Sequence, residues 1–152
     1  MPPPERNAVS SQEITNLIHR YAELMDRGDF TGVGQLFANA SYGAGDAAVR
    51  GAEAVEAMMR GIVVTYDDGT PRTQHVTTNT IIEIDADAAT ARSCFTVFQN
   101  PPGGPIAVVV MGRYHDRFER RGAAWHFAER RVQVDHTADL SRHLRVDPFR
   151  GG

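Results

Sequence analysis

Apolar residues recur at helical spacing near the start of the chain. Ser10 and Glu13 match a capping box, in which a serine caps a helix and a glutamate three residues later bonds back to it. We therefore expect a helix that begins at Ser10 and ends at Gly28, preceded by a flexible, proline-rich arm over residues 1–9. The apolar stripe of this helix consists of Ile14, Leu17, Ile18, Tyr21 and Met25.

Two shorter helices are predicted next, and then the period of the pattern changes. Asp29 can cap a helix over residues 30–38, and residues 51–66 have a second helical pattern, with a short strand and turn at 40–45 between them. After residue 72 apolar and polar residues alternate, and short turns separate the runs, which is typical of antiparallel strands. The predicted strands are 73–85, 89–99, 105–121 and 125–140.

Helices followed by a run of strands indicate an α+β fold, with the helices packed on one face of a curved antiparallel sheet. The length of 152 residues suits one domain with a single core. We expect that domain to span residues 10–140, with residues 141–152 as a tail.

Composition narrows the class of protein. The chain is 41% hydrophobic and 23% charged, as in ordinary globular proteins, and its formal net charge of -3 gives no reason to expect a nucleic-acid or membrane partner. The single cysteine, Cys94, cannot form an internal disulfide, and the N-terminal residues lack the features of a signal peptide. No apolar run is long enough to span a membrane. These features predict a cytoplasmic protein.

Two residues are candidates for proton transfer. Asp26 lies at the margin of the apolar stripe, near a helix C-terminus, where the helix dipole disfavours a carboxylate. It is either a polar residue at the edge of the stripe that bonds a neighbouring loop, or a general base. His75 is in phase with Thr77 and Asn79 on one strand, and this polar face is either solvated or part of a cavity.

Charged residues on the last two strands offer fewer candidates. Arg130 and Arg131 point to opposite faces, so one can be buried, and Asp135 or His136 are possible partners for a charge pair. The chain has no phosphate loop, nucleophile elbow or zinc motif. Three histidines could gather on a curved sheet, but no short ligand spacing supports a metal site. These are His75, His115 and His136.

Over residues 8–139 the sequence resembles the SnoaL-like group of the nuclear transport factor 2-like superfamily. The resemblance rests on RYAELMDRGDFTGVGQLFA, GAEAVEAMM, QHVTTNTIIEID with ATARS, GRYHDRFERR and WHFAERRVQVD. It implies a cone-shaped α+β barrel around an apolar pocket. Members near scytalone dehydratase and bile-acid 7α-dehydratase work without a cofactor, using an Asp–His dyad. By similarity, Asp26 and His75 form the dyad, and Tyr21, Tyr42 and Arg130 bind substrate. Asn79, on the polar strand face of His75, is a further expected substrate-binding residue.

Two functions follow from this resemblance. The first is a cofactor-independent lyase or isomerase, of dehydratase or cyclase type, acting on a small hydrophobic, cyclic, oxygenated molecule. The second is a non-catalytic module that binds a small ligand or oligomerises. With either function we expect a homodimer or higher homo-oligomer formed through the outer face of the sheet.

Overall fold

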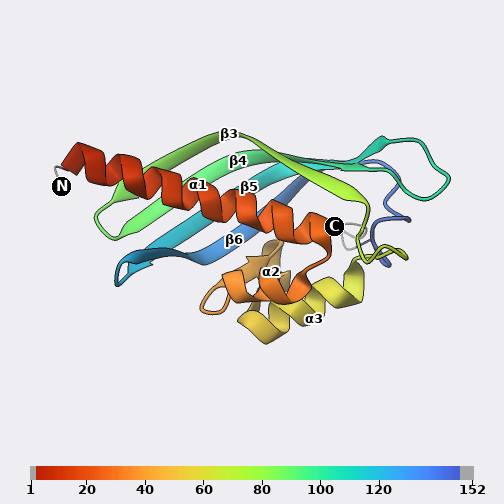
Figure 1. Cartoon of the computed structure of the whole chain (residues 1–152), viewed down its shortest axis with the longest axis horizontal. Coiled ribbons are helices and arrows are strands. Elements are labelled where there is room, and N and C mark those ends of the chain that lie inside the picture. The colour runs from red at the N-terminus through yellow and green to blue at the C-terminus, as the bar shows by residue number, and fades with distance from the viewer. Residues whose placement is uncertain (1–2, 148–152) are drawn as a thin grey trace.

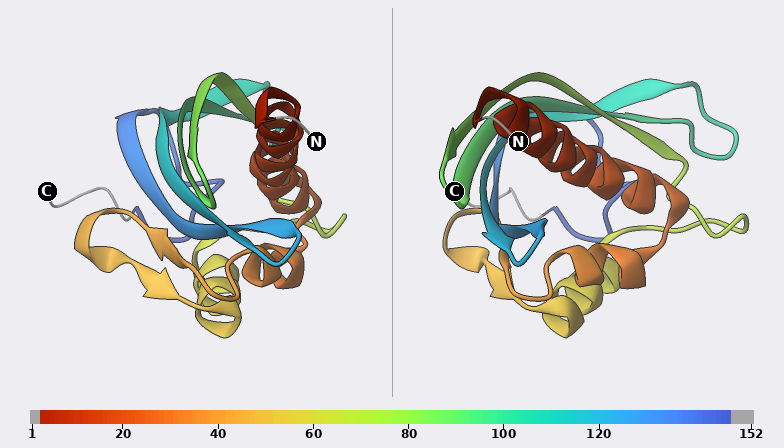
Figure 2. Two further views of the ribbon diagram at one scale, coloured as in Figure 1. Left: turned by 90° about the vertical axis from the view of Figure 1, so that its left-hand side faces the viewer. Right: turned by 60° about the vertical axis from the view of Figure 1, so that its left-hand side comes forward.

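The computed structural model describes residues 3–147. In this part of the chain, helix α1 crosses the concave face of a curved sheet, and α2 and α3 pack together near one end of α1 (Figure 1; Figure 2). None of these helices is long and apolar enough to cross a membrane. The elements are α1 (Pro3–Arg27), α2 (Phe30–Leu36), β1 (Ser41–Gly43), the 3-10 turn η1 (Gly45–Ala47), β2 (Val49–Arg50), α3 (Ala52–Ile62), β3 (Thr73–Asp85), β4 (Ala88–Gln99), β5 (Ala107–Arg121) and β6 (Ala124–Thr137).

The sheet has the strand order β2-β1-β6-β5-β4-β3. All neighbouring strands are antiparallel except β1 and β6, which are parallel. The predicted α+β class and curved sheet are confirmed. The two outermost strands, β2 and β3, do not pair with each other, so the sheet stays open and does not close into a barrel.

Helix α1 starts earlier than the capping box predicted. It begins at Pro3, and Ser10 lies in its interior with only 5% of its surface exposed, so Ser10 does not cap the helix. A proline is tolerated in the first turn because the helix does not use that N–H, and Glu5 is favourable there because it faces the positive end of the helix dipole. The prediction of an arm over residues 1–9 is therefore wrong for residues 3–9.

A β-bulge in β3 changes which side chains face the core. The register with β4 shifts between Thr78 and Ile81, and Asn79 adopts a positive φ of 55°. Before the bulge His75 points inward; after it Ile82 does, while Ile81 is 46% exposed. The predicted common face of His75 and Asn79 is wrong, because the extra residue reverses the alternation.

The C-terminal segment folds back onto the molecule. Leu144 forms a β-bridge with Val63. The N–H of Val64 donates to the carbonyl of His143 at 2.8 Å, and the N–H of Arg145 donates to the carbonyl of Ile62 at 2.8 Å. Residues 141–147 are therefore not a free tail, and two of them, His143 and Leu144, line the cavity beside α3. Residues 148–152 of the predicted tail lie outside the described residues.

Candidate active site

Asp26 and His75 meet where the end of α1 packs on the start of β3. The Nδ1 of His75 lies 2.6 Å from Oδ1 of Asp26. The backbone N–H of His75 donates to Oδ2 at 2.9 Å, and the hydroxyl of Thr73 donates to Oδ1 at 2.9 Å. Because donors surround the carboxylate, it acts as the acceptor, so Nδ1 carries the ring proton. Nε2 is then the nitrogen with a free lone pair.

The end of α1 is fixed by a close backbone contact. Gly28 has a φ of +72°, and a Cβ placed on it would lie 2.2 Å from the carbonyl oxygen of Gly69. Only glycine fits this position without strain or a clash. The contact joins the helix end to the loop before β3, which keeps Asp26 beside His75. The two side chains are 22% and 6% exposed, respectively.

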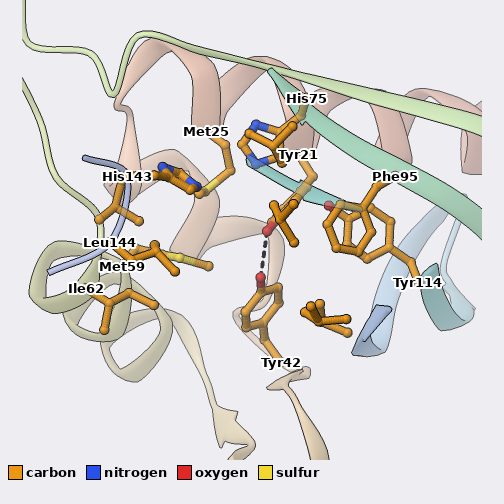
Figure 3. A pocket seen from close by; sticks show the side chains of 15 residues that line it. Tyr21, Met25, Tyr42, Met59, Ile62, His75, Phe95, Tyr114, His143 and Leu144 are labelled. Carbon is orange, nitrogen blue, oxygen red and sulfur yellow. Dashed lines mark hydrogen bonds between the residues drawn. The ribbon is translucent and has the colours of Figure 1, made fainter. Parts of the chain in front are cut away.

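His75 lines a small cavity of about 90 Å³ between α1, α3 and the concave face of the sheet. Its walls are mostly apolar, and the polar groups come from tyrosine and histidine side chains (Figure 3). The stacked rings of Phe95 and Tyr114, with centroids 4.3 Å apart, form one wall. The other lining residues are Tyr21, Met25, Tyr42, Met59, Ile62, Val63, Val97, Val110, Val132, Val134, His143 and Leu144.

Tyr21 and Tyr42 form a hydroxyl pair in this cavity. Their oxygens are 2.6 Å apart, and either can be the donor (Figure 3). Burial raises the pKa of both phenols, so they stay protonated at neutral pH. Both residues line the cavity, so the pair places phenol hydroxyls at its wall, where they can hydrogen-bond an oxygen.

Arg130 does not line the cavity, contrary to the prediction that it binds substrate. It is completely buried and makes a bidentate pair with Asp116, with N–O distances of 2.8 and 2.9 Å. Its guanidinium carbon lies 3.7 Å from the ring centroid of Tyr114 and 4.5 Å from that of Tyr21. Burial works to lower its pKa, but the Asp116 carboxylate raises the pKa above the ordinary value. The guanidinium of Arg130 therefore packs against the rings of Tyr21 and Tyr114. Asp135 and His136, the partners predicted from the sequence, do not pair with Arg130.

Other predicted residues lie away from the cavity. Asn79 is exposed, and its amide lies 4.0 Å from the sulfur of Cys94, so the structure does not bring it to the cavity beside His75. His115 bonds Gln133 at 2.9 Å on the outer face of the sheet. No group of three possible metal-binding side chains gathers within residues 3–147.

His143 is a cavity residue that sequence reasoning missed. It is 5% exposed, and its ring centroid is 6.4 Å from that of His75. Burial, with a smaller contribution from His75, lowers its pKa from 6.5 to about 4. No spacing marks it as special; the apolar pair Leu140 and Leu144, four residues apart, is the one sign that this segment packs.

The open curved sheet, covered by helices around a partly polar cavity, defines the nuclear transport factor 2-like class of α+β proteins. Residues 7–131 match the model of the SnoaL-like domain family, so the chain belongs to that family.

Several solved structures share the fold. The D26N variant of Rv3472, a protein of unknown function from Mycobacterium tuberculosis, has a TM-score of 0.75 and 24% identity, covering 100% of this chain and 85% of that one. A candidate scytalone dehydratase from Novosphingobium aromaticivorans DSM 12444 has a TM-score of 0.73 and 19% identity, with coverages of 90% and 91%. LinA has a TM-score of 0.70 and 16% identity, with coverages of 89% and 92%. No curated protein sequence matches the chain at a significant level.

Proposed function

We propose that this protein is a cofactor-independent lyase or isomerase that removes a proton from a small hydrophobic, cyclic, oxygenated substrate. One observation carries the proposal: Asp26 holds Nδ1 of His75 at 2.6 Å, and the His75 ring lines a cavity. A neutral imidazole held in this tautomer can accept a proton through Nε2. The folds of the candidate scytalone dehydratase and of LinA are consistent with this chemistry.

The proposed reaction begins at a carbon next to a carbonyl group. Nε2 of His75 takes the proton as the C–H bond breaks, and Asp26 stabilises the imidazolium that forms. Negative charge moves to the carbonyl oxygen, which accepts a hydrogen bond from a hydroxyl of the Tyr21–Tyr42 pair.

The intermediate then has two fates. In an elimination, a carbon–carbon double bond forms and a hydroxyl leaves from the neighbouring carbon as water, taking the proton back from His75. In an isomerisation, His75 returns the proton to a different carbon. Both fates return the dyad to its starting state.

The size of the cavity limits the substrate. About 90 Å³ is well below the roughly 300–1,000 Å³ of typical ligand pockets. Met25 and Met59 line it, and methionine is the apolar side chain that changes shape most easily. We therefore infer a substrate of one ring, with the two methionines moving to admit it.

Proton abstraction can be tested without knowledge of the leaving group. The protein is incubated in D2O with cyclic, terpenoid and aromatic ketones, and deuterium incorporation beside the carbonyl is followed by mass spectrometry. We expect exchange with the unaltered protein and none with His75→Ala. His115→Ala, a matched histidine variant on the outer face, should exchange at the unaltered rate. Equal exchange by His75→Ala would refute the proposal.

A second candidate function is a non-catalytic module that binds a ligand or oligomerises. It is favoured by the small cavity and by apolar side chains exposed on the outer sheet face, where Met111 and Ile81 are each 46% exposed. Under this alternative no ketone exchanges deuterium. Met111→Glu should then convert an oligomer to monomers in analytical ultracentrifugation.

A further inference from the structure

His143 enters the cavity from a different element than the other polar groups. His75 comes from β3, Tyr21 from α1 and Tyr42 from β1, whereas His143 lies on the C-terminal segment (Figure 3). His143 is buried, with 5% of the residue surface exposed. Its Nδ1 has no hydrogen-bond partner among residues 3–147.

The residues around His143 explain why Nδ1 has no partner. The ring of His75 lies 6.4 Å away, centroid to centroid, and the side chains of Met25, Met59 and Leu144 in the cavity wall offer no strong donor or acceptor (Figure 3). Leaving such a buried nitrogen unpaired costs on the order of 1–3 kcal/mol. The position is therefore unfavourable for folding alone and suits a group that bonds a molecule in the cavity.

The backbone does not let His143 move away easily. Its carbonyl accepts from Val64, and the preceding carbonyl, that of Arg142, accepts from the side chains of Gln99, at 2.9 Å, and of Tyr66. Gln99 is itself 2% exposed and also donates to the carbonyl of Pro71 at 3.1 Å. These hydrogen bonds hold the backbone at His143 and at the residue before it, which keeps the ring in the cavity.

We propose that His143 hydrogen-bonds a second oxygen of the substrate, so that the pocket selects a small cyclic ketone that also carries a hydroxyl group. This inference rests on the proposed function, because that function places the ketone oxygen at the Tyr21–Tyr42 pair. His143 and the tyrosine pair enter the cavity from different sides, and His75 lies above the pair (Figure 3). A ring spanning this space presents one oxygen to each.

The protonation state of His143 fits this role. With a pKa of about 4, caused first by burial, its imidazole is neutral at pH 7. A neutral ring both accepts from a hydroxyl and donates to one, whereas a charged ring beside His75 would oppose the imidazolium that forms there.

The test compares cyclohexanone with its para-hydroxy derivative as NMR titration probes. The unaltered protein should bind the hydroxyketone about tenfold more tightly, the gain expected of one good hydrogen bond in a buried site. His143→Phe should reduce this ratio to about one, and His143→Gln should restore part of it. His19→Phe, at an exposed histidine on α1, is the matched control and should keep the ratio.

Each outcome bears on one proposal. Failure of the unaltered protein to prefer the hydroxyketone, including failure to bind either probe, overturns the inference, as does an unchanged ratio in His143→Phe. Deuterium exchange tests the function separately: the unaltered protein should exchange both probes, and His75→Ala should exchange neither. If no ketone exchanges but the ratio depends on His143, the proposed reaction fails and the binding inference stands.

Discussion

Asp26 and His75 lie 49 residues apart in the chain, yet their side chains approach to 2.6 Å. The same carboxylate also binds the backbone N–H of His75 and the hydroxyl of Thr73. One side chain thus joins the end of α1 to the start of β3 and fixes the orientation of the imidazole. A carboxylate used for structure alone would need only the backbone contact; the contact with Nδ1 also controls which ring nitrogen is free.

Asp26→Asn should therefore separate catalysis from folding. The amide keeps the shape of the side chain but cannot stabilise an imidazolium, so deuterium exchange should fall by about 100- to 10,000-fold. The free energy of unfolding should fall by no more than about 2 kcal/mol, because part of the hydrogen bonding survives. Urea denaturation measures the second quantity.

The control is Asp29→Asn, which makes the same chemical change three residues later. Asp29 accepts from the N–H of Gly32 at 2.9 Å as the cap of α2, and asparagine caps helices equally well. Exchange should be unchanged in this variant. Unaltered exchange in Asp26→Asn itself would remove Asp26 from the proposed dyad.

Asp116→Asn should destabilise the fold strongly. It leaves the buried guanidinium of Arg130 without its counter-charge, which typically costs about 3–5 kcal/mol of unfolding free energy. Replacing both residues, as Arg130→Met with Asp116→Leu, should recover most of that loss, because no buried charge remains. Urea denaturation of the single and double variants measures both effects.

An exposed pair on the same two strands provides the comparison. Arg117 and Glu129 are 3.6 Å apart, and the arginine side chain is 55% exposed. Arg117→Met should change the unfolding free energy by less than about 1 kcal/mol. A similar loss in both arginine pairs would show that burial does not control the energy of the Arg130 pair.

The sequence was sufficient to predict the order of helices and strands, because a period of 3.6 or 2 in the apolar positions is clear when it repeats over a long element. It was insufficient where one residue changes the phase. The bulge in β3 moves Asn79 to the outer face, and nothing in a run of threonines and isoleucines marks where the extra residue falls.

The same limit applies to residues whose role depends on tertiary contacts. Arg130 was recognised as important, but its partner Asp116 lies on the neighbouring strand, at a register that spacing alone does not give. His143 was assigned to a tail because the segment lacks a period of its own. Its position comes from pairing with residues 62–64, a contact between distant parts of the chain.

The buried tyrosines should make the protein sensitive to alkali. Burial raises the pKa of Tyr21, Tyr42 and Tyr114 above the ordinary value of 10.0, so the folded state holds these protons to higher pH than the unfolded chain does. Their contribution to stability is complete below about pH 10 and is lost as pH rises toward the raised values. Of the four tyrosines, no more than one should form phenolate before the protein unfolds, as followed by ultraviolet absorption and near-ultraviolet circular dichroism. Phenolate from two or more tyrosines in folded protein would contradict this.

His143 should produce a loss of stability on the acid side. Its folded-state pKa of about 4 lies below the ordinary 6.5, so between these values the unfolded chain binds a proton that the folded state does not. Stability from this residue is therefore complete above about pH 6.5 and decreases as pH falls toward 4, by up to about 3 kcal/mol. His143→Gln removes the titrating group, so its unfolding free energy should fall less steeply over this range, as measured by urea denaturation at several pH values. His19→Gln, at an exposed position on α1, should keep the steep decrease of the unaltered protein. An equally steep decrease in His143→Gln would mean that the imidazole is protonated in the folded state and is not shielded in the cavity.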